Sequence, residues 1–179
     1  MSGGSRRVKT WFTADTHFGH AGAIGIFKRP FRSVAEMDDA IVARWNEVVA
    51  PADKVWHLGD FAIGATRQRI ANLLQQLNGT KYLIIGNNDG AATTRAVGWE
   101  NAEHYADIAF EDVRLILCHY PFRTWDGISK GSYNLHGHSH GRLTPLRRQV
   151  DVGVDVWEFR PVSLDVLRTR RAARPPRRG

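Results

Sequence analysis

Five short segments of the chain carry aspartate, histidine and asparagine side chains of the kind that bind metal ions. They are Asp15-Thr16-His17, Gly59-Asp60, Gly86-Asn87, Cys118-His119 and His136-Gly137-His138-Ser139-His140. Each segment follows a short apolar run that reads as a strand, and strand ends are where α/β folds carry their chemistry. Residues two positions apart in an extended segment point to the same side, so Asp15 and His17 can reach one ion. We therefore expect the five segments to meet at one edge of a sheet.

The candidate ligands offer oxygen and imidazole nitrogen but no thiolate, a set that suits Mn²⁺, Fe, Zn²⁺ or Ni²⁺. They are Asp15, His17, Asp60, Asn87, His119, His138 and His140. These ligands are too many for one tetrahedral ion but match a centre of two divalent ions with open positions. Such a centre activates water and stabilises phosphoryl oxygens during in-line attack. The sequence thus predicts a two-metal site, with Mn²⁺ as the favoured ion.

Apolar runs alternate with helical patterns along the chain, which predicts an α/β domain with layered sheets. The first half reads as strands over 8–14, 54–58 and 81–85 and helices over 33–50 and 66–77. Ser33 and Glu36 form a capping-box signal for the first of these helices. The second half reads as strands over 106–110, 113–118, 133–136 and 149–156, with a short helix beginning near Ser163.

Composition favours a single folded domain with a basic tail. The chain has 179 residues, 42% of them hydrophobic, and a formal net charge of +7. Seven of its arginines lie from residue 160 onward, so we expect a domain over 1–167 and a disordered basic tail over 168–179 that could contact nucleic acid. The single cysteine, Cys118, and the lack of a signal-like or membrane-spanning apolar run predict a cytoplasmic protein without a membrane partner.

The ordered motifs resemble those of the calcineurin-like metallophosphoesterase superfamily, and in particular its compact bacterial and phage-type members. The matching residues are Asp15-x-His17, Gly59-Asp60, Gly86-Asn87-x-Asp89, His119 and Gly137-His138-x-His140. The resemblance implies a four-layer α/β/β/α sandwich of two mixed sheets flanked by helices. It also implies two ligand sets that share Asp60 as a bridge. The first set is Asp15, His17, Asp60 and His140, and the second is Asp60, Asn87, His119 and His138.

One position departs from the family pattern. The Gly-Asn segment of the family continues with a histidine that contacts the phosphate and assists the leaving group, whereas this chain has Asn88. An amide can donate a hydrogen bond to a phosphoryl oxygen but cannot deliver a proton at neutral pH. His20, three residues beyond His17, is a candidate to take over that role, so we name Asn88 and His20 as the catalytic candidates.

The sequence therefore predicts a metal-dependent phosphoesterase, and Asn88 favours a phosphodiesterase that acts on nucleotides or nucleic-acid ends. The alternatives are a phosphomonoesterase and a catalytically impaired metal-binding or interaction scaffold. Aromatic and basic residues near the ligands could bind a base and a phosphate. The substrate-binding candidates are Arg32, Tyr120 and Arg123.

Overall fold

The computed structural model describes residues 7–170, and its first sheet has five strands in the order β4-β3-β2-β1-β9. The strands are β1 (Thr10–Thr13), β2 (Lys54–His57), β3 (Thr80–Ile84), β4 (Trp99–Glu103) and β9 (Val162–Ser163). Strands β1 to β4 run parallel, and β9 pairs antiparallel with β1, so the sheet is mixed. The parallel strands bring their carboxyl ends to one edge of the sheet.

The second sheet has four strands in the order β5-β6-β7-β8. They are β5 (Tyr105–Phe110), β6 (Val113–Cys118), β7 (Tyr133–His136) and β8 (Gln149–Asp151). The β5–β6 pair is an antiparallel hairpin, whereas β6, β7 and β8 are parallel to one another. The carboxyl ends of β6 and β7 therefore also lie at a common edge.

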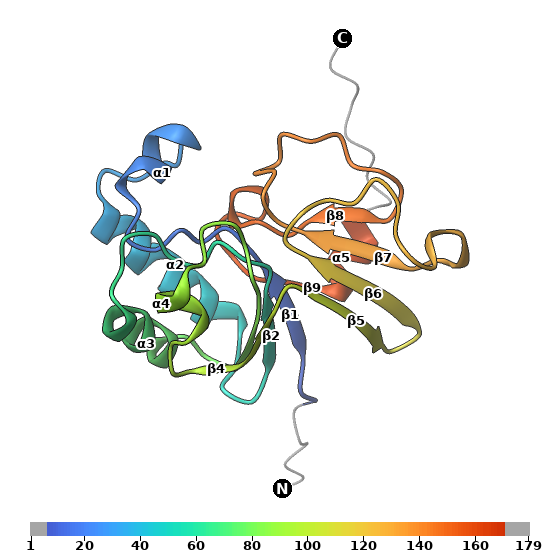
Figure 1. Cartoon of the computed structure of the whole chain (residues 1–179), viewed down its shortest axis with the longest axis horizontal. Helices are drawn as coiled ribbons and strands as arrows, with labels where there is room; N and C mark the ends of the chain where they lie inside the picture. Colours follow the sequence, from blue (N-terminus) through green and yellow to red (C-terminus); the bar gives the residue numbers. More distant parts are fainter. Residues whose placement is uncertain (1–6, 171–179) are drawn as a thin grey trace, which may run out of the picture.

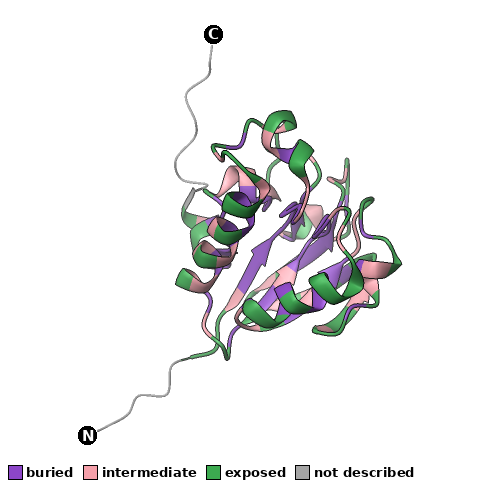
Figure 2. Ribbon diagram, turned by 90° about the vertical axis from the view of Figure 1, so that its left-hand side faces the viewer, coloured by how far each residue is buried: buried purple, intermediate pink, exposed green. Residues whose placement is uncertain are grey.

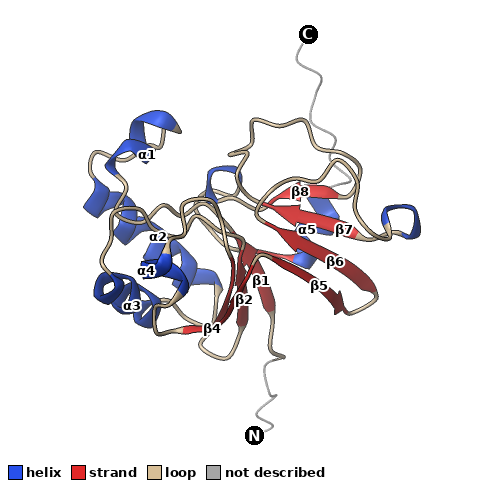
Figure 3. Cartoon of the chain, viewed as in Figure 1, coloured by secondary structure: helices blue, strands red, loops and turns tan. Residues whose placement is uncertain are grey.

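Helices cover the outer face of the first sheet (Figure 1; Figure 3). They are α2 (Val34–Val48), α3 (Arg67–Gln76) and α4 (Ala91–Thr94), while α1 (Ala21–Ile26) lies beyond the edge of the sheet (Figure 1). Helix α2 begins where the sequence predicts, because the Ser33 hydroxyl accepts a hydrogen bond from the Glu36 N–H. The buried stripe of α2, which includes Met37, Ile41 and Trp45, packs against the sheet, while its other side faces solvent (Figure 2).

A second core lies between the two sheets. Phe12 of β1 and Leu58 after β2 meet Leu115 and Leu135 of the second sheet, and all four are fully buried. Helix α5 (Leu164–Arg170) adds Leu164 to this core. The outer face of the second sheet is covered by the segment 119–132, which carries the short helix η1 (Ile128–Lys130). None of the helices within residues 7–170 has the length and apolar character needed to span a bilayer.

The predicted architecture of two mixed sheets with flanking helices is confirmed. One predicted strand, 149–156, is shorter than expected and ends at Asp151, after which η2 (Val154–Val156) begins. The strand stops because the Asp151 carboxylate accepts the Gly153 N–H, while the Val154 N–H turns to the carbonyl of Ala14. Helix α5 continues to Arg170 and its Arg168 pairs with Asp112. Residues 171–179 of the expected tail lie outside the described part of the chain.

His57 is a core histidine whose titration should govern part of the stability. Its side chain is fully buried, and burial, helped by His119 and His17, lowers its pKa from 6.5 to about 3. The unfolded chain therefore binds a proton at this residue between pH 6.5 and 3 while the folded chain does not. Stability from this group is complete above pH 6.5 and is lost as the pH falls, at about 1.4 kcal/mol per pH unit.

We predict that His57→Phe makes the decline in the free energy of unfolding between pH 6.5 and 4 shallower by about that amount. Urea unfolding at several pH values in EDTA measures it. Phe12→Leu, a core change that removes no titratable group, should lower stability without altering the slope. An unchanged slope in His57→Phe would show that the histidine titrates alike in both states.

Candidate metal centre

The loops that follow β1, β2, β3, β6 and β7 meet at one edge, where the two sheets come together. The Asp15 N–H donates to the carbonyl of Gly59 over 2.9 Å, which holds the β1 loop against the β2 loop. The His138 N–H donates to the Asp15 carboxylate over 2.9 Å, which joins the second sheet to the first. The predicted meeting of the five segments therefore occurs.

Two groups of side chains bring their potential ligand atoms together. Asp15, His17 and His140 form one group, and Asp15, Asp60 and His119 form the other; within each group the atoms lie within 4.8 Å of one another. Asp60 lies between two histidines, since its Oδ2 is 3.7 Å from His17 Nε2 and its Oδ1 is 3.6 Å from His119 Nε2. Each oxygen of this carboxylate thus faces a different half of the cluster.

His119 is oriented with its lone pair toward the cluster. Its Nδ1 lies 2.7 Å from the Leu58 carbonyl, which can only accept, so Nδ1 carries the hydrogen. Burial lowers the pKa of His119, so the ring is neutral at pH 7 and Nε2 is an acceptor. This atom is 3.1 Å from Oδ1 of Asn87, which is also an acceptor. Nε2 of His119, Oδ1 of Asn87 and the Asp60 carboxylate are all acceptors and lie close together. A bound cation would stabilise this arrangement.

The surroundings of His17 and Asp15 also favour a bound cation. Neither ring nitrogen of His17 has a hydrogen-bond partner within residues 7–170, although the side chain is buried. Burial lowers the pKa of His17 to about 3, so the ring is neutral. Burial first, and then the nearby carboxylate of Asp151, raise the pKa of Asp15 well above its usual value. A divalent ion would bind the buried lone pairs and neutralise the crowded carboxylates, so the residues present fit a metal centre.

Backbone strain accompanies the site. Five of the predicted ligands adopt left-handed backbone conformations, namely Asp15, His17, Asp60, His138 and His140, with φ between 46° and 64°. Such conformations are uncommon outside glycine and are found at functional sites where the surrounding structure enforces them. Tight packing enforces them here: a Cβ on Gly137 would lie 2.7 Å from Oδ2 of Asp15.

The other predicted site residues lie at different distances from the cluster. Asn88 donates from Nδ2 to Oδ2 of Asp60 over 2.6 Å, so its amide contacts the bridging candidate directly. The His20 ring centroid lies 5.6 Å from that of His17, and Tyr120 packs edge-on against His138 at 4.8 Å. No hydrogen bond or ion pair within the described residues links the side chains of Arg32 and Arg123 to the cluster.

Sequence reasoning missed Asp151, Asp155 and the role of Arg29. Asp151 accepts from the Ser139 hydroxyl and the Gly141 N–H, which holds the loop after β7. Asp155 accepts from His140 and Arg29. Burial alone would raise the pKa of Asp155, but the hydrogen bonds from His140 and Arg29 lower it. The signal that could have identified them is their position at the carboxyl end of β8, where Asp151 is the last residue of the strand and Asp155 follows in η2.

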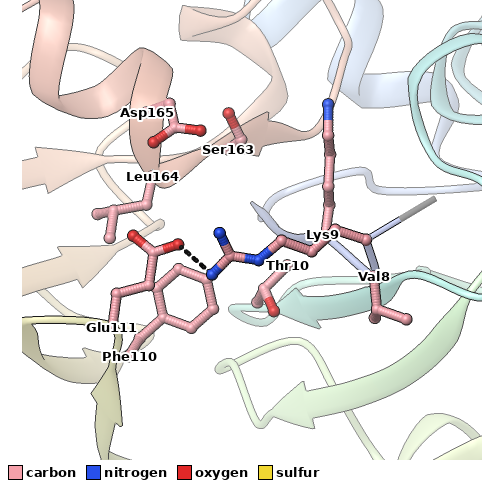
Figure 4. A pocket seen from close by; sticks show the side chains of 9 residues that line it. Val8, Lys9, Thr10, Phe110, Glu111, Ser163, Leu164 and Asp165 are labelled. Atoms are coloured by element: carbon pink, nitrogen blue, oxygen red, sulfur yellow. Dashed lines mark hydrogen bonds and ion pairs between the residues drawn. The ribbon is translucent and has the colours of Figure 1, made fainter. Parts of the chain in front are cut away.

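A separate cavity of about 220 Å³ lies at the other end of the first sheet (Figure 4). Its lining includes Thr10 at the amino end of β1, Phe110, and Asp165 of α5. Asp15 follows the carboxyl end of β1, so this cavity is remote from the histidine cluster.

The sequence matches the model of the family described as calcineurin-like phosphoesterase over residues 8–173. It is 31% identical to an uncharacterized protein of Methanocaldococcus jannaschii, covering 89% of each chain. It is 32% identical to the gene 66 protein of Mycobacterium phage L5, over 83% of this chain and 87% of the phage protein.

Among solved structures, a protein of unknown function from Aquifex aeolicus has the same fold, with a TM-score of 0.72 and 20% identity. The match covers 92% of this chain and all of the other. The family match over residues 8–173 makes the protein a phosphoesterase by class, that is, a hydrolase of phosphate ester bonds, and the family implies divalent metal ions. The chain belongs to the calcineurin-like phosphoesterase family.

We predict that Gly137→Ala displaces Asp15 and weakens both folding and metal binding. The added Cβ would lie 2.6 Å from the Ala14 Cβ and 2.7 Å from the Asp15 carboxylate, so the loops must separate. Overpacking of this kind costs about 1–3 kcal/mol. Urea unfolding and Mn²⁺ binding by calorimetry measure the two effects.

Gly90→Ala is the matched control, because a Cβ there meets nothing within 4 Å and φ is −77°. It should leave both quantities unchanged. Equal stability and equal Mn²⁺ binding in Gly137→Ala and Gly90→Ala would contradict the close packing of Gly137 against Asp15.

Proposed function

We propose that the protein is a phosphodiesterase with a dinuclear metal centre, in which Mn²⁺ is the favoured ion. Asp15, His17, Asp60 and His140 would hold one ion, and Asp60, Asn87, His119 and His138 the other. Bound ions of this kind supply an activated water and stabilise charge on the phosphoryl oxygens. The observation that carries the proposal is the convergence of three buried side chains: Nε2 of His17 and Nε2 of His119 lie 3.7 Å and 3.6 Å from the two oxygens of Asp60, beyond hydrogen-bond distance.

Asn88 supports a diester as substrate. Its amide nitrogen contacts Asp60, so it lies where a phosphoryl group bound to the ions would be within reach of a hydrogen bond. It cannot protonate a leaving group at neutral pH, and loss of a general acid costs about 10²–10⁴-fold for poor leaving groups. The substrates that suffer least are diesters with good leaving groups.

His20 is the residue that we propose as the proton donor or phosphate contact in place of the family histidine. Its ring lies beside His17, and its Nδ1 is buried with no hydrogen-bond partner among the described residues. Its Nδ1 is thus not committed to another protein group in residues 7–170.

Tyr120 supports a nucleotide or a nucleic-acid end as substrate. Its side chain is 44% exposed although the ring packs against His119 and His138, so it presents one face to a base at the second half of the site. Arg32 and Arg123 are exposed and stay proposed phosphate contacts. We propose the cytoplasm as the compartment, since the single cysteine, Cys118, is free and buried.

The test is hydrolysis of bis-p-nitrophenyl phosphate and of p-nitrophenyl phosphate with Mn²⁺, by the natural chain and by Asn88→His. We expect the natural chain to cleave the diester, and the variant to gain turnover of phenyl phosphate, a monoester with a poorer leaving group, by about 10²-fold because it regains a general acid. Asn101→His, on the exposed part of β4, is the control and should gain nothing.

Preference of the natural chain for the monoester would overturn the diesterase proposal. Mn²⁺ binding without hydrolysis of either ester by the natural chain or Asn88→His would favour the scaffold alternative.

A further inference from the structure

Arg29 is a buried arginine that directs most of its donors at protein groups around the candidate metal centre, with Nη1 also 3.5 Å from the sulfur of Met37. It is only 4% exposed. Its Nη2 donates to the carbonyl of Asp15 over 2.7 Å and its Nη1 to the carbonyl of Thr16 over 2.9 Å. Burial of a charge is costly unless it is paired and fully hydrogen-bonded, and Arg29 meets that condition. The guanidinium therefore fixes the backbone from which Asp15 and His17 project.

Asp155 connects the same arginine to the histidine after β7. The Nε and Nη2 atoms of Arg29 each lie 2.8 Å from an oxygen of Asp155, which is a bidentate pair. Oδ2 of Asp155 lies 2.7 Å from Nδ1 of His140. A carboxylate paired with arginine can only accept, so Nδ1 of His140 carries the hydrogen and Nε2 keeps its lone pair. Asp155 thus sets which nitrogen of His140 can serve as a ligand.

Phe27 supports the same two histidines from the side. Its ring stacks on His140 with centroids 3.6 Å apart and planes 11° apart, and on His17 at 5.3 Å. The Arg29 guanidinium lies 5.4 Å from the Phe27 ring. A single turn of chain after α1 therefore contacts three candidate ligands of one half of the site.

We propose that Arg29 and Asp155 are positioning residues that set the metal affinity of the Asp15, His17 and His140 half of the site. The inference rests on the proposed function, because it assumes that both halves bind ions. The other half is oriented differently: His119 is held by the Leu58 carbonyl, and Asp60 by the N–H and amide of Asn88. Loss of Arg29 or Asp155 should therefore weaken the binding of one ion and leave the binding of the other unchanged.

The test is the stepwise affinity of the full chain for Mn²⁺, measured by competition with a chromophoric chelator. Electron paramagnetic resonance of bound Mn²⁺ then separates coupled pairs from single ions. In Asp155→Asn, the amide oxygen still accepts from His140 but the negative charge is lost. We expect one of the two dissociation constants to rise about 10–100-fold, the usual effect of losing a partner of a metal-bound histidine, and the other to stay unchanged. The signal of a coupled pair should give way to that of a single ion.

Arg29→Lys provides a second variant, since lysine keeps the charge but cannot make the bidentate pair. It should weaken the same ion. Asp38→Asn is the matched control: Asp38 is a buried aspartate that pairs with Arg69 and accepts from the Gly19 N–H, and no hydrogen bond or ion pair within residues 7–170 joins it to a histidine. It should lower the free energy of unfolding while leaving both affinities for Mn²⁺ unchanged.

Unchanged affinities for Mn²⁺ in both Asp155→Asn and Arg29→Lys would overturn this inference and leave the proposed function standing. Equal weakening of both ions, matched by Asp38→Asn, would overturn it too, because that result reports general loosening. A natural chain that bound no Mn²⁺ would overturn the proposed function, and this inference with it.

Discussion

Crowding of buried carboxylates at the junction of the two sheets is the constraint on which the rest of the structure depends. Asp15 is fully buried, and the negative charges of Asp151, Asp60 and Asp155 all raise its pKa. Like charges in a water-poor site repel strongly, so the fold must supply compensation. Peptide N–H groups supply part of it, Arg29 supplies another part, and we propose that divalent ions supply the remainder.

That need for compensation explains the unusual backbone of the loops. N–H groups reach a buried carboxylate only if the loops approach it closely, and glycines at positions 137 and 153 allow this approach to Asp15. The same geometry places Asp15, Asp60 and His138 in left-handed conformations. Strain of this kind persists where packing fixes it, and here the cores on both sides of the first sheet provide that packing.

The sequence predicts the part of the site that depends on residue type and position after a strand. Asp15, Asp60 and His119 each lie close behind the carboxyl end of a strand, and parallel pairing brings strand ends together whatever the details of the loops. Side-chain direction within loops is not predictable in this way. From the sequence, Arg29 belongs to a basic segment that could line the rim of the site, yet the path of the chain after α1 turns it inward to Asp155.

The helices and strands also divide into those that local sequence predicts and those that it does not. Helix α2 follows from its capping residues and apolar stripe, whereas α1 has little such signal, because two glycines interrupt its six residues. Strand β8 ends early because the Asp151 carboxylate accepts the Gly153 N–H in a local turn and the Val154 N–H donates to the Ala14 carbonyl, a tertiary contact that the sequence pattern does not reveal. Tertiary contacts to the carboxylate cluster thus decide the elements that local propensity does not.

We propose that this cluster holds two divalent ions with Asp60 between them. Anomalous scattering from crystals grown with Mn²⁺ tests it most directly, because it locates each ion independently of catalysis. We expect two anomalous peaks about 3.5–4 Å apart, one beside His17 and His140 and the other beside His119 and His138. A single peak, or peaks only at surface carboxylates, would contradict it.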